Sequence, residues 1–134
     1  MSTPDTSVVV AGFASWHEKH PQARGSMQES DRLIAHVALE AFSVLTRMPP
    51  PQRASPSSVV EFLQHHFPAP RFVLSSAGYG SLLSVSAERG ISGGAIYDAV
   101  VAMTAREAKA LLITLDERAA NTYQAIGADF RLLR

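Results

Sequence analysis

Two acidic side chains interrupt apolar segments of the sequence that otherwise look like buried helix. Glu40 lies within the run 33–45 and Asp98 within the run 94–103, and neither has a lysine or arginine within four positions. An isolated buried carboxylate is costly, so each of these acids needs a partner from elsewhere in the chain. The residues three and four positions from Asp98 are mostly small, which leaves room for a ligand beside its carboxylate.

Two further acids, Asp5 and Asp116, are expected where a strand gives way to a helix. Ligands of parallel α/β sheets bind beyond the carboxyl ends of the strands, where the following helices begin. Asp5, Glu40, Asp98 and Asp116 can all reach that edge. Four carboxylates without sulfur or a histidine pair match a hard divalent ion such as Mg²⁺ or Mn²⁺, with an anionic substrate, normally a phosphate, completing the site.

Each acid also has a purely structural alternative. Asp5 and Asp116 are good N-capping residue types, and Glu40 and Asp98 could lie on the solvent-exposed sides of their helices. Taken together, the four acids favour a common site, because the structural alternative has to place them at one sheet edge by coincidence.

Short β-branched or leucine-rich runs alternate with longer amphipathic stretches, which predicts an α/β fold with a mostly parallel sheet. By composition, strands are predicted at 7–13, 33–37, 71–74, 111–114 and 129–133. Helices are predicted at 38–47, 76–89, 95–109 and 117–126, with a further helix that opens at Ser55 and Pro56 and ends before Pro68. Gly90 and Gly127 are expected to terminate helices.

Composition sets broad limits on the class of protein. At 134 residues, with 46% hydrophobic and 18% charged residues, the chain is expected to form one domain over residues 1–134 with a sizeable core. Zero cysteines exclude disulfides and sulfur-based metal sites, so any metal must be bound by oxygen or imidazole.

The twelve basic and twelve acidic residues cancel, so no global positive field indicates a nucleic-acid partner. No membrane span and no secretory signal is recognisable, which predicts a cytoplasmic protein.

Other motifs give little support to other chemistries. His17 and His20 fall in a predicted polar loop, and His65 and His66 are adjacent at a helix end, so all four are interpreted as surface residues. The glycine-containing segment 75–80 lacks the lysine of a phosphate-binding loop, and no GxSxG motif supports a serine hydrolase.

Four segments make the chain resemble the PIN-domain ribonucleases, specifically the toxins of VapBC-type toxin–antitoxin modules. They are Asp5-Thr6-Ser7 before an apolar run, the segment 39–47 followed by prolines, the segment 93–106 carrying Ile96-Tyr97-Asp98-Ala99, and the segment 112–119. The resemblance covers nearly the whole chain. It implies a three-layer α/β/α fold with a short central sheet, and it places residues 7–13 in a helix, which we adopt over the composition-based strand.

The resemblance also implies an activity. Asp5, Glu40, Asp98 and Asp116 would be the catalytic acids that hold one or two Mg²⁺ or Mn²⁺ ions, with Ser7 and Thr114 supporting them. Members of the family cleave single-stranded RNA, are inhibited by a cognate VapB-type antitoxin and commonly form homodimers. One departure is that only four residues precede Asp5, and Pro4 cannot donate a ladder hydrogen bond, so the first strand should be short or distorted.

The expected mechanism follows from charge. Clustered carboxylates repel one another unless a divalent ion compensates them, and a bound ion would generate a hydroxide that attacks the phosphodiester in line. Arg47, Arg106 and Arg118 are candidates for holding flanking phosphates, with ordinary surface salt bridges as the alternative for each. A phosphoacceptor receiver domain fits poorly, because residues 41–97 contain no aspartate. A catalytically silent PIN-like partner-binding module stays open as the second alternative, although the intact acid set argues against it.

Overall fold

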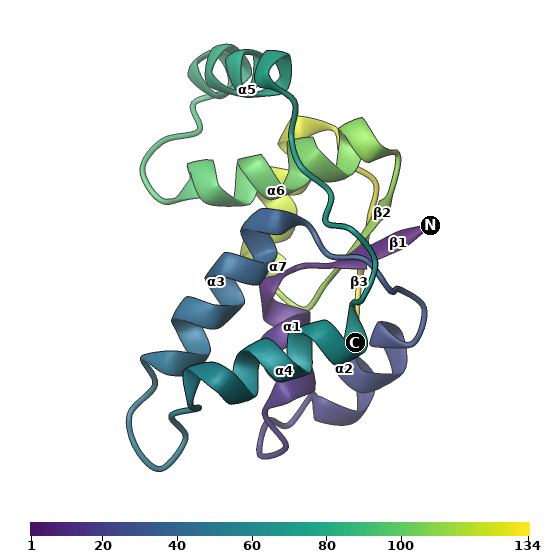
Figure 1. Cartoon of the computed structure of the whole chain (residues 1–134). Helices are drawn as coiled ribbons and strands as arrows, with labels where there is room; N and C mark the ends of the chain where they lie inside the picture. The colour runs from purple at the N-terminus through teal and green to yellow at the C-terminus, as the bar shows by residue number, and fades with distance from the viewer.

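Three short parallel strands lie at the centre of the molecule, with helices on both sides (Figure 1). The computed structural model describes all 134 residues. The strands are β1 (Ser2–Pro4), β2 (Leu111–Thr114) and β3 (Phe130–Leu132), in the order β1-β2-β3 and parallel throughout. The arrangement confirms the predicted three-layer α/β/α class and the short first strand.

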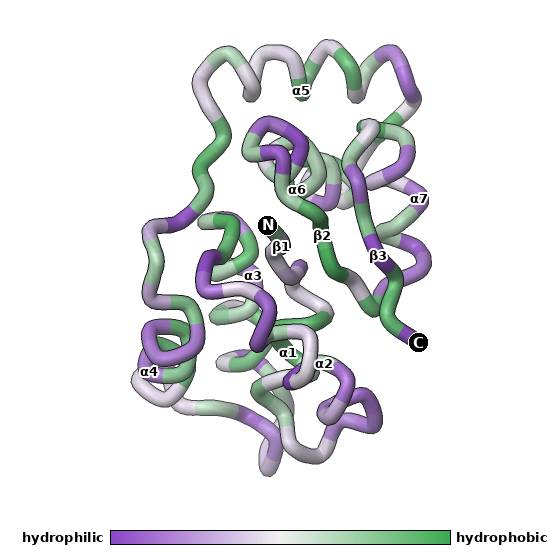
Figure 2. Tube along the Cα trace, turned by 90° about the vertical axis from the view of Figure 1, so that its right-hand side faces the viewer, coloured by the Kyte–Doolittle hydropathy of each residue, from purple (hydrophilic) through white to green (hydrophobic).

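The central strand β2 is formed by an almost continuously apolar segment. Leu112, Ile113 and Thr114 are buried, as expected for a parallel strand that is covered on both faces. Thr3 of β1 pairs with Leu112, and Phe130 of β3 pairs with Leu112 from the other side. Figure 2 shows β2 as a strongly hydrophobic stretch between its two neighbours.

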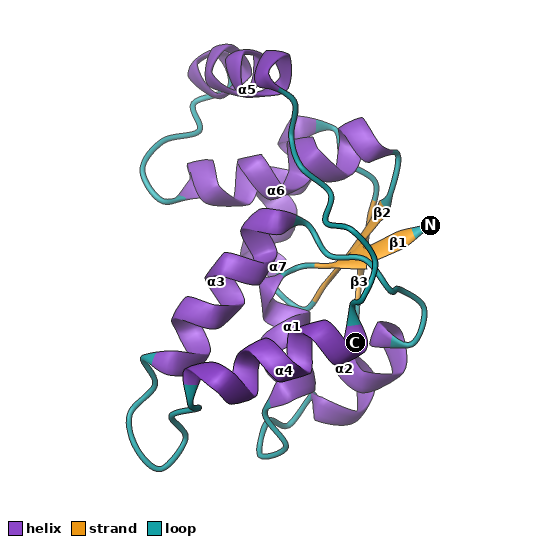
Figure 3. Cartoon of the chain, viewed as in Figure 1, coloured by secondary structure: helices purple, strands orange, loops and turns teal.

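Seven helices surround the sheet (Figure 3). Figures 1 and 2 show α1 to α4 gathered on one side of the strands and α5 to α7 on the other, with α5 packed along α6 at the margin. Their bounds are α1 (Thr6–Phe13), α2 (His20–Met27), α3 (Ala35–Thr46), α4 (Pro56–His66), α5 (Ser76–Glu88), α6 (Ala95–Ala108) and α7 (Glu117–Ile126). No helix is both long and apolar enough to span a membrane.

Helix α1 forms despite its three consecutive valines. Asp5 caps its N-terminus by accepting a hydrogen bond from the backbone N–H of Val8. Val8 and Val9 are fully buried in the core, and the absence of a side chain on Gly12 allows Met27 of α2 to approach closely. Tertiary packing therefore outweighs the strand propensity of the valines, and the family-based prediction of a helix is confirmed.

Two of the strands expected from composition are absent. Residues 33–37 and 71–74 contribute only an isolated parallel bridge between Ile34 and Phe72, with Ala35 N–H donating to the Phe72 carbonyl at 2.9 Å. Helix α3 begins at Ala35 and buries Val37 and, one and two turns later, Ala41 and Leu45. A run that is apolar at nearly every position does not reveal its period, so the choice of strand was wrong here.

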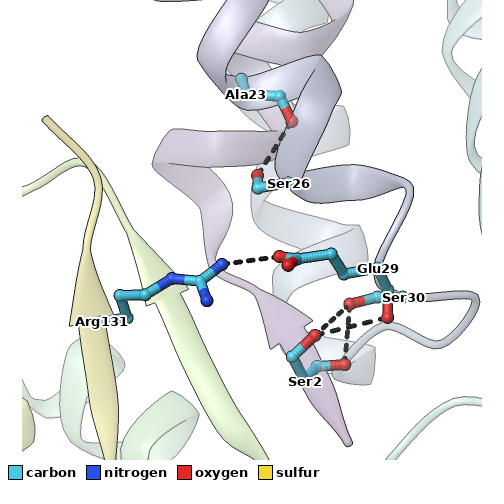
Figure 4. A network of polar contacts seen from close by, with 6 residues as sticks. All are labelled: Ser2, Ala23, Ser26, Glu29, Ser30 and Arg131. Atoms are coloured by element: carbon cyan, nitrogen blue, oxygen red, sulfur yellow. Dashed lines mark hydrogen bonds and ion pairs between the residues drawn. The ribbon is translucent and has the colours of Figure 1, made fainter.

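Helix α2 occupies a segment that was expected to be a polar loop. Pro21 sits in its first turn, and the connection that follows α2 is attached to the strands. In Figure 4, Ser30 donates to the Ser2 carbonyl of β1 at 2.8 Å, and Glu29 pairs with Arg131 of β3 at 2.6 Å. This connection therefore joins the two outer strands of the sheet.

The remaining helices agree closely with the sequence-based expectations. Ser55 caps α4 through the N–H of Ser58, and Pro56 occupies its first turn. Gly127 ends α7 at a φ of 84°, a left-handed conformation that glycine adopts without strain. One continuous cluster of 29 buried residues, which includes β2 and the inner faces of α1, α3, α6 and α7, forms the core that supports the strand ends.

Candidate active site

The four predicted acids line one pocket at the carboxyl edge of the sheet. Asp5 directly follows β1 and Asp116 lies two residues after β2, so adjacent parallel strands deliver both to the same edge. Glu40 comes from α3 and Asp98 from the first turn of α6. The pocket has a volume of about 930 Å³, and its wall also includes Ser7, Val10, Val44, Val101, Leu115, Arg118, Tyr123 and the turn 17–19.

Asp5 is the most enclosed acid of the pocket. Its side chain is almost inaccessible, with 3% of the residue exposed. Ser7 donates to Oδ1 at 2.5 Å, and the Val8 N–H donates to the same oxygen at 3.3 Å. Burial raises the pKa of Asp5, while hydrogen bonds from Ser7, Thr114, Tyr123 and Val8 oppose that rise. The N-capping alternative is thus also correct, because the capping carboxylate lies in the pocket.

Tyr123 is the polar neighbour that sequence reasoning missed. Its hydroxyl donates to Oδ2 of Asp5 at 2.7 Å, and 2% of the residue is exposed. Burial and the adjacent Asp5 raise the pKa of Tyr123 far above its ordinary value, so its hydroxyl stays protonated and can donate to Asp5. Tyr123 lies seven positions after Asp116, two helical turns along α7, so the two residues share one face of that helix.

Asp116 combines capping with an available oxygen. Its Oδ1 accepts from the N–H groups of Arg118 and Ala119 at 3.0 and 3.2 Å, so it caps α7. Its own N–H donates to Oγ1 of Thr114 at 3.0 Å, which orients the turn after β2. Oδ2 of Asp116 makes no hydrogen bond within the protein and stays available to a ligand in the pocket.

Ser7 links the segments that follow β1 and β2. While it donates to Asp5, its Oγ also accepts the N–H of Leu115, at 2.9 Å. Leu115 immediately precedes Asp116, so one hydroxyl holds together the segments that carry two of the acids. Ser7 and Thr114 are thus hydrogen-bonded to the segments that carry Asp5 and Asp116.

The pocket disfavours the ionised forms of both Glu40 and Asp98. Burial, followed by the charges of Asp98 and Asp5, raises the pKa of Glu40 to about 7. Burial also raises the pKa of Asp98, with the charges of Asp116 and Asp5 adding to the effect and Arg118 opposing it. These mutual effects show that the four carboxylates share one electrostatic environment.

His36 contacts Glu40 from the preceding turn of α3. Nε2 of His36 lies 2.8 Å from Oε1 of Glu40, and the imidazole stacks on Tyr97, with ring centroids 5.7 Å apart and an interplanar angle of 5°. Burial lowers the pKa of His36, which favours the neutral ring. His36 thus limits the positions that the Glu40 side chain can adopt.

The donor chemistry of the pocket fits a hard divalent cation, although no three acidic or histidine side chains are gathered closely enough to hold one ion as they stand. All four acids present carboxylate oxygens, the ligands that Mg²⁺ and Mn²⁺ prefer. Carboxylates that repel one another separate until a cation compensates them. Burial alone raises the pKa of Asp5, whereas burial together with the charges of neighbouring carboxylates raises the pKa values of Glu40 and Asp98.

The three arginine candidates have different surroundings. Arg118 lines the pocket, and its positive charge opposes the rise in the pKa of Asp98. Arg47, at the end of α3, is exposed and donates to Ser43, and Arg106 donates to the Ile126 carbonyl at the end of α7. Neither of these two lines the pocket. Lys19, a cation that the sequence analysis did not single out, lies in the wall instead.

Comparison with known proteins identifies the family of this chain. The PIN domain family model matches residues 3–125. Ribonuclease VapC40 of Mycobacterium tuberculosis is 44% identical over 133 residues, which is 99% of this chain and 99% of the relative. Ribonuclease VapC27 of the same organism is 39% identical over 124 residues, covering 92% of this chain and 90% of the relative.

Solved structures share the architecture at low sequence identity. The structure of FitAB bound to an IR36 DNA fragment superposes with a TM-score of 0.72 at 14% identity, covering 98% of this chain and 94% of that one. FitAcB from Neisseria gonorrhoeae superposes with a TM-score of 0.71 at 16% identity, covering 97% and 96%. At this level of identity the likeness establishes the fold.

Proposed function

Because this chain belongs to the PIN domain family and, within it, to the VapC proteins, we propose that it is a metal-dependent endoribonuclease that hydrolyses phosphodiester bonds of RNA. The observation that carries the proposal is the convergence of Asp5, Glu40, Asp98 and Asp116, from four different elements, on one pocket. The ribonuclease names of the two relatives support the choice of RNA.

Asp5, Glu40, Asp98 and Asp116 would hold Mg²⁺ or Mn²⁺. When bound, such an ion supplies an activated water and neutralises charge on the phosphate. The protein contributes the positions of the donors. Ser7 and Tyr123 fix the two oxygens of Asp5, and backbone N–H groups fix Oδ1 of Asp116 and leave Oδ2 without a hydrogen bond from the protein.

Glu40 contributes a carboxyl group that changes its protonation near neutral pH. In the metal-free pocket its pKa is raised to about 7, and a bound cation would favour the ionised, ligating form. His36 restrains Oε1 of Glu40 from the preceding turn of α3.

Arg118, at the pocket wall, would hold a phosphate that flanks the scissile bond. In-line attack by water would leave 5′-phosphate and 3′-hydroxyl ends.

The proposal extends to partners. The resemblance to VapBC toxins implies that a VapB-type antitoxin binds this chain and blocks the pocket, and that the chain forms a homodimer. We expect co-expression with the product of an adjacent small antitoxin gene to yield a stable complex without nuclease activity. Recovery of activity after proteolytic removal of that partner would support inhibition by occlusion.

A paired substitution tests the nuclease directly. Asp98→Asn removes one carboxylate of the pocket, and Asp129→Asn makes the same change at an exposed position outside it. We expect wild type and Asp129→Asn to cleave unpaired RNA with Mg²⁺ or Mn²⁺ and to lose activity in chelator, and Asp98→Asn to be inactive in all conditions.

Two results would contradict the proposal. Equal cleavage by all samples, including those with chelator, would exclude the metal mechanism. Absence of both cleavage and Mn²⁺ binding in the wild type, with antitoxin binding retained, would instead identify a silent partner-binding PIN-like module.

A further inference from the structure

The pocket extends well beyond the acids. Its wall follows α1 past Val10 and reaches His17, Glu18 and Lys19 in the turn between α1 and α2. Helix α1 has eight residues, which corresponds to a length of about 12 Å at 1.5 Å per residue. The pocket is therefore a groove with an acidic end, at the N-terminus of α1, and a distal end at the turn that follows this helix.

The turn at the distal end is held by its own hydrogen bonds. The His17 N–H donates to the Ala14 carbonyl and the His20 N–H donates to the His17 carbonyl, both at 3.0 Å. The Lys19 N–H donates to Nδ1 of His17 at 3.0 Å, which fixes the orientation of the imidazole. His20 is tied to the Ala11 carbonyl at 2.8 Å. The side chains of the turn are thus presented on an ordered backbone.

Trp16 is the exposed aromatic residue of this turn. It is the only tryptophan of the chain, and 55% of it is exposed. Its ring centroid lies 6.1 Å from that of His17, with an interplanar angle of 38°. Trp16 takes no part in the buried core, and the nuclease proposal gives it no role. Lys19, three residues further along the chain, lines the groove and supplies a cationic side chain.

An aromatic platform next to a cation is a combination that binds single-stranded nucleic acid. Unpaired bases stack on aromatic rings, while a neighbouring cation attracts the backbone phosphates. A paired base inside a duplex offers no free face to such a ring. The position of the turn, at the end of a groove that begins at the acids, would let one strand contact both ends.

The geometry points to a second substrate subsite at the turn Trp16–Lys19, where the exposed Trp16 adjoins His17 and Lys19 of the groove wall. In this subsite an unpaired base stacks on Trp16, and Lys19 contacts a phosphate of the same strand. The inference rests on the proposed function, because it takes RNA as the ligand of the groove. It adds a requirement: the substrate must be unpaired at the turn as well as at the scissile bond.

The single tryptophan makes binding at this subsite directly observable. The probe is a fluorescein-labelled ten-nucleotide RNA without self-complementarity, mixed with the Asp98→Asn variant, which we expect to bind without cleaving. We expect saturable quenching of the Trp16 emission that follows the same binding curve as the anisotropy of the label. Binding seen by anisotropy with unchanged Trp16 emission would overturn the subsite, as would failure of the RNA to bind.

Kinetics of the wild-type chain and its variants provide the second measurement. Trp16→Ala should raise KM for the unpaired RNA about tenfold with kcat nearly unchanged. Trp16→Phe keeps an aromatic ring and should have a KM close to that of the wild type. The control is Tyr79→Ala, which removes an equally exposed aromatic side chain from α5, outside the groove. Wild-type KM in Trp16→Ala would overturn the subsite.

The two proposals can fail separately. Cleavage without Trp16 quenching would refute the subsite and leave the nuclease standing. Trp16 quenching by RNA without any metal-dependent cleavage by the wild type would support the subsite and refute the nuclease.

Discussion

The hydroxyl of Tyr123 donates a 2.7 Å hydrogen bond to Oδ2 of Asp5, a residue 118 positions earlier in the chain. The bond joins the last helix, α7, to the residue that follows the first strand, β1, and both residues line the acidic pocket. The first acid of the site is therefore positioned by one of the last structural elements of the chain to be synthesised.

Tyr123→Phe removes only this hydroxyl. The substitution should cost about 2 kcal/mol of folding free energy, because a buried carboxylate loses one of its donors. Mn²⁺ affinity should fall about tenfold, since the orientation of Asp5 is less restrained. Calorimetric Mn²⁺ titration and thermal unfolding measure the two effects. Tyr79→Phe, at an exposed site on α5, is the matched control. Unchanged stability and affinity would show that the bond is unimportant.

Ser7→Ala should separate the exits of β1 and β2. The substitution leaves the Leu115 N–H without its acceptor and Oδ1 of Asp5 without its shortest hydrogen bond. A loss of about 1 to 3 kcal/mol is expected from denaturant unfolding. Ser15→Ala, at an exposed position, should change stability by less than about 0.5 kcal/mol. Equal stabilities of the two variants would contradict the bridging role of Ser7.

The stability of the metal-free protein should depend on pH through Glu40. Its folded pKa of about 7 lies above the ordinary value of 4.5, so between these pH values the folded state holds a proton that the unfolded state has released. The contribution of Glu40 to stability is therefore complete below pH 4.5 and is lost as pH rises through about 7.

Glu40→Gln should remove that dependence. In chelator at pH 8, the variant should be more stable than wild type by about 1 kcal/mol, allowing for solvent screening of a carboxyl that is partly exposed, and the difference should shrink at pH 5. Thermal unfolding at the two pH values measures it. Glu61→Gln, on the exposed face of α4, is the control. A variant less stable than wild type at pH 8 would contradict the raised pKa.

Two glycines should respond oppositely to alanine. A Cβ at Gly12 would lie 2.2 Å from Sδ of the buried Met27, whereas a Cβ at Gly25 meets nothing within 4 Å. Gly12→Ala should destabilise the protein by about 1 to 3 kcal/mol through overpacking of α1 on α2. Gly25→Ala should stabilise it by about 0.5 to 1 kcal/mol, because alanine favours the helix. Denaturant unfolding decides whether the signs differ.

Local chemistry was enough to predict several elements. Ser55 with Pro56 starts α4, Gly127 ends α7, and the apolar run before Asp116 is β2. Helix caps, glycine terminators and buried strands can be recognised from a few consecutive residues. The acids at 40 and 98 were likewise detectable, since a charge in an apolar helix requires an explanation from outside that helix.

Other features depended on contacts between distant segments. The valines of α1 and the apolar run before α3 carry no clear period, so packing against the core decided their conformation. Sequence alone thus determined the class of fold and indicated which acids are candidates for holding a cation. Only the tertiary structure decided that Tyr123 reaches Asp5, that Arg118 and Lys19 line the groove while Arg47 and Arg106 do not, and that the acids share one electrostatic environment, because these relationships join residues far apart in the chain.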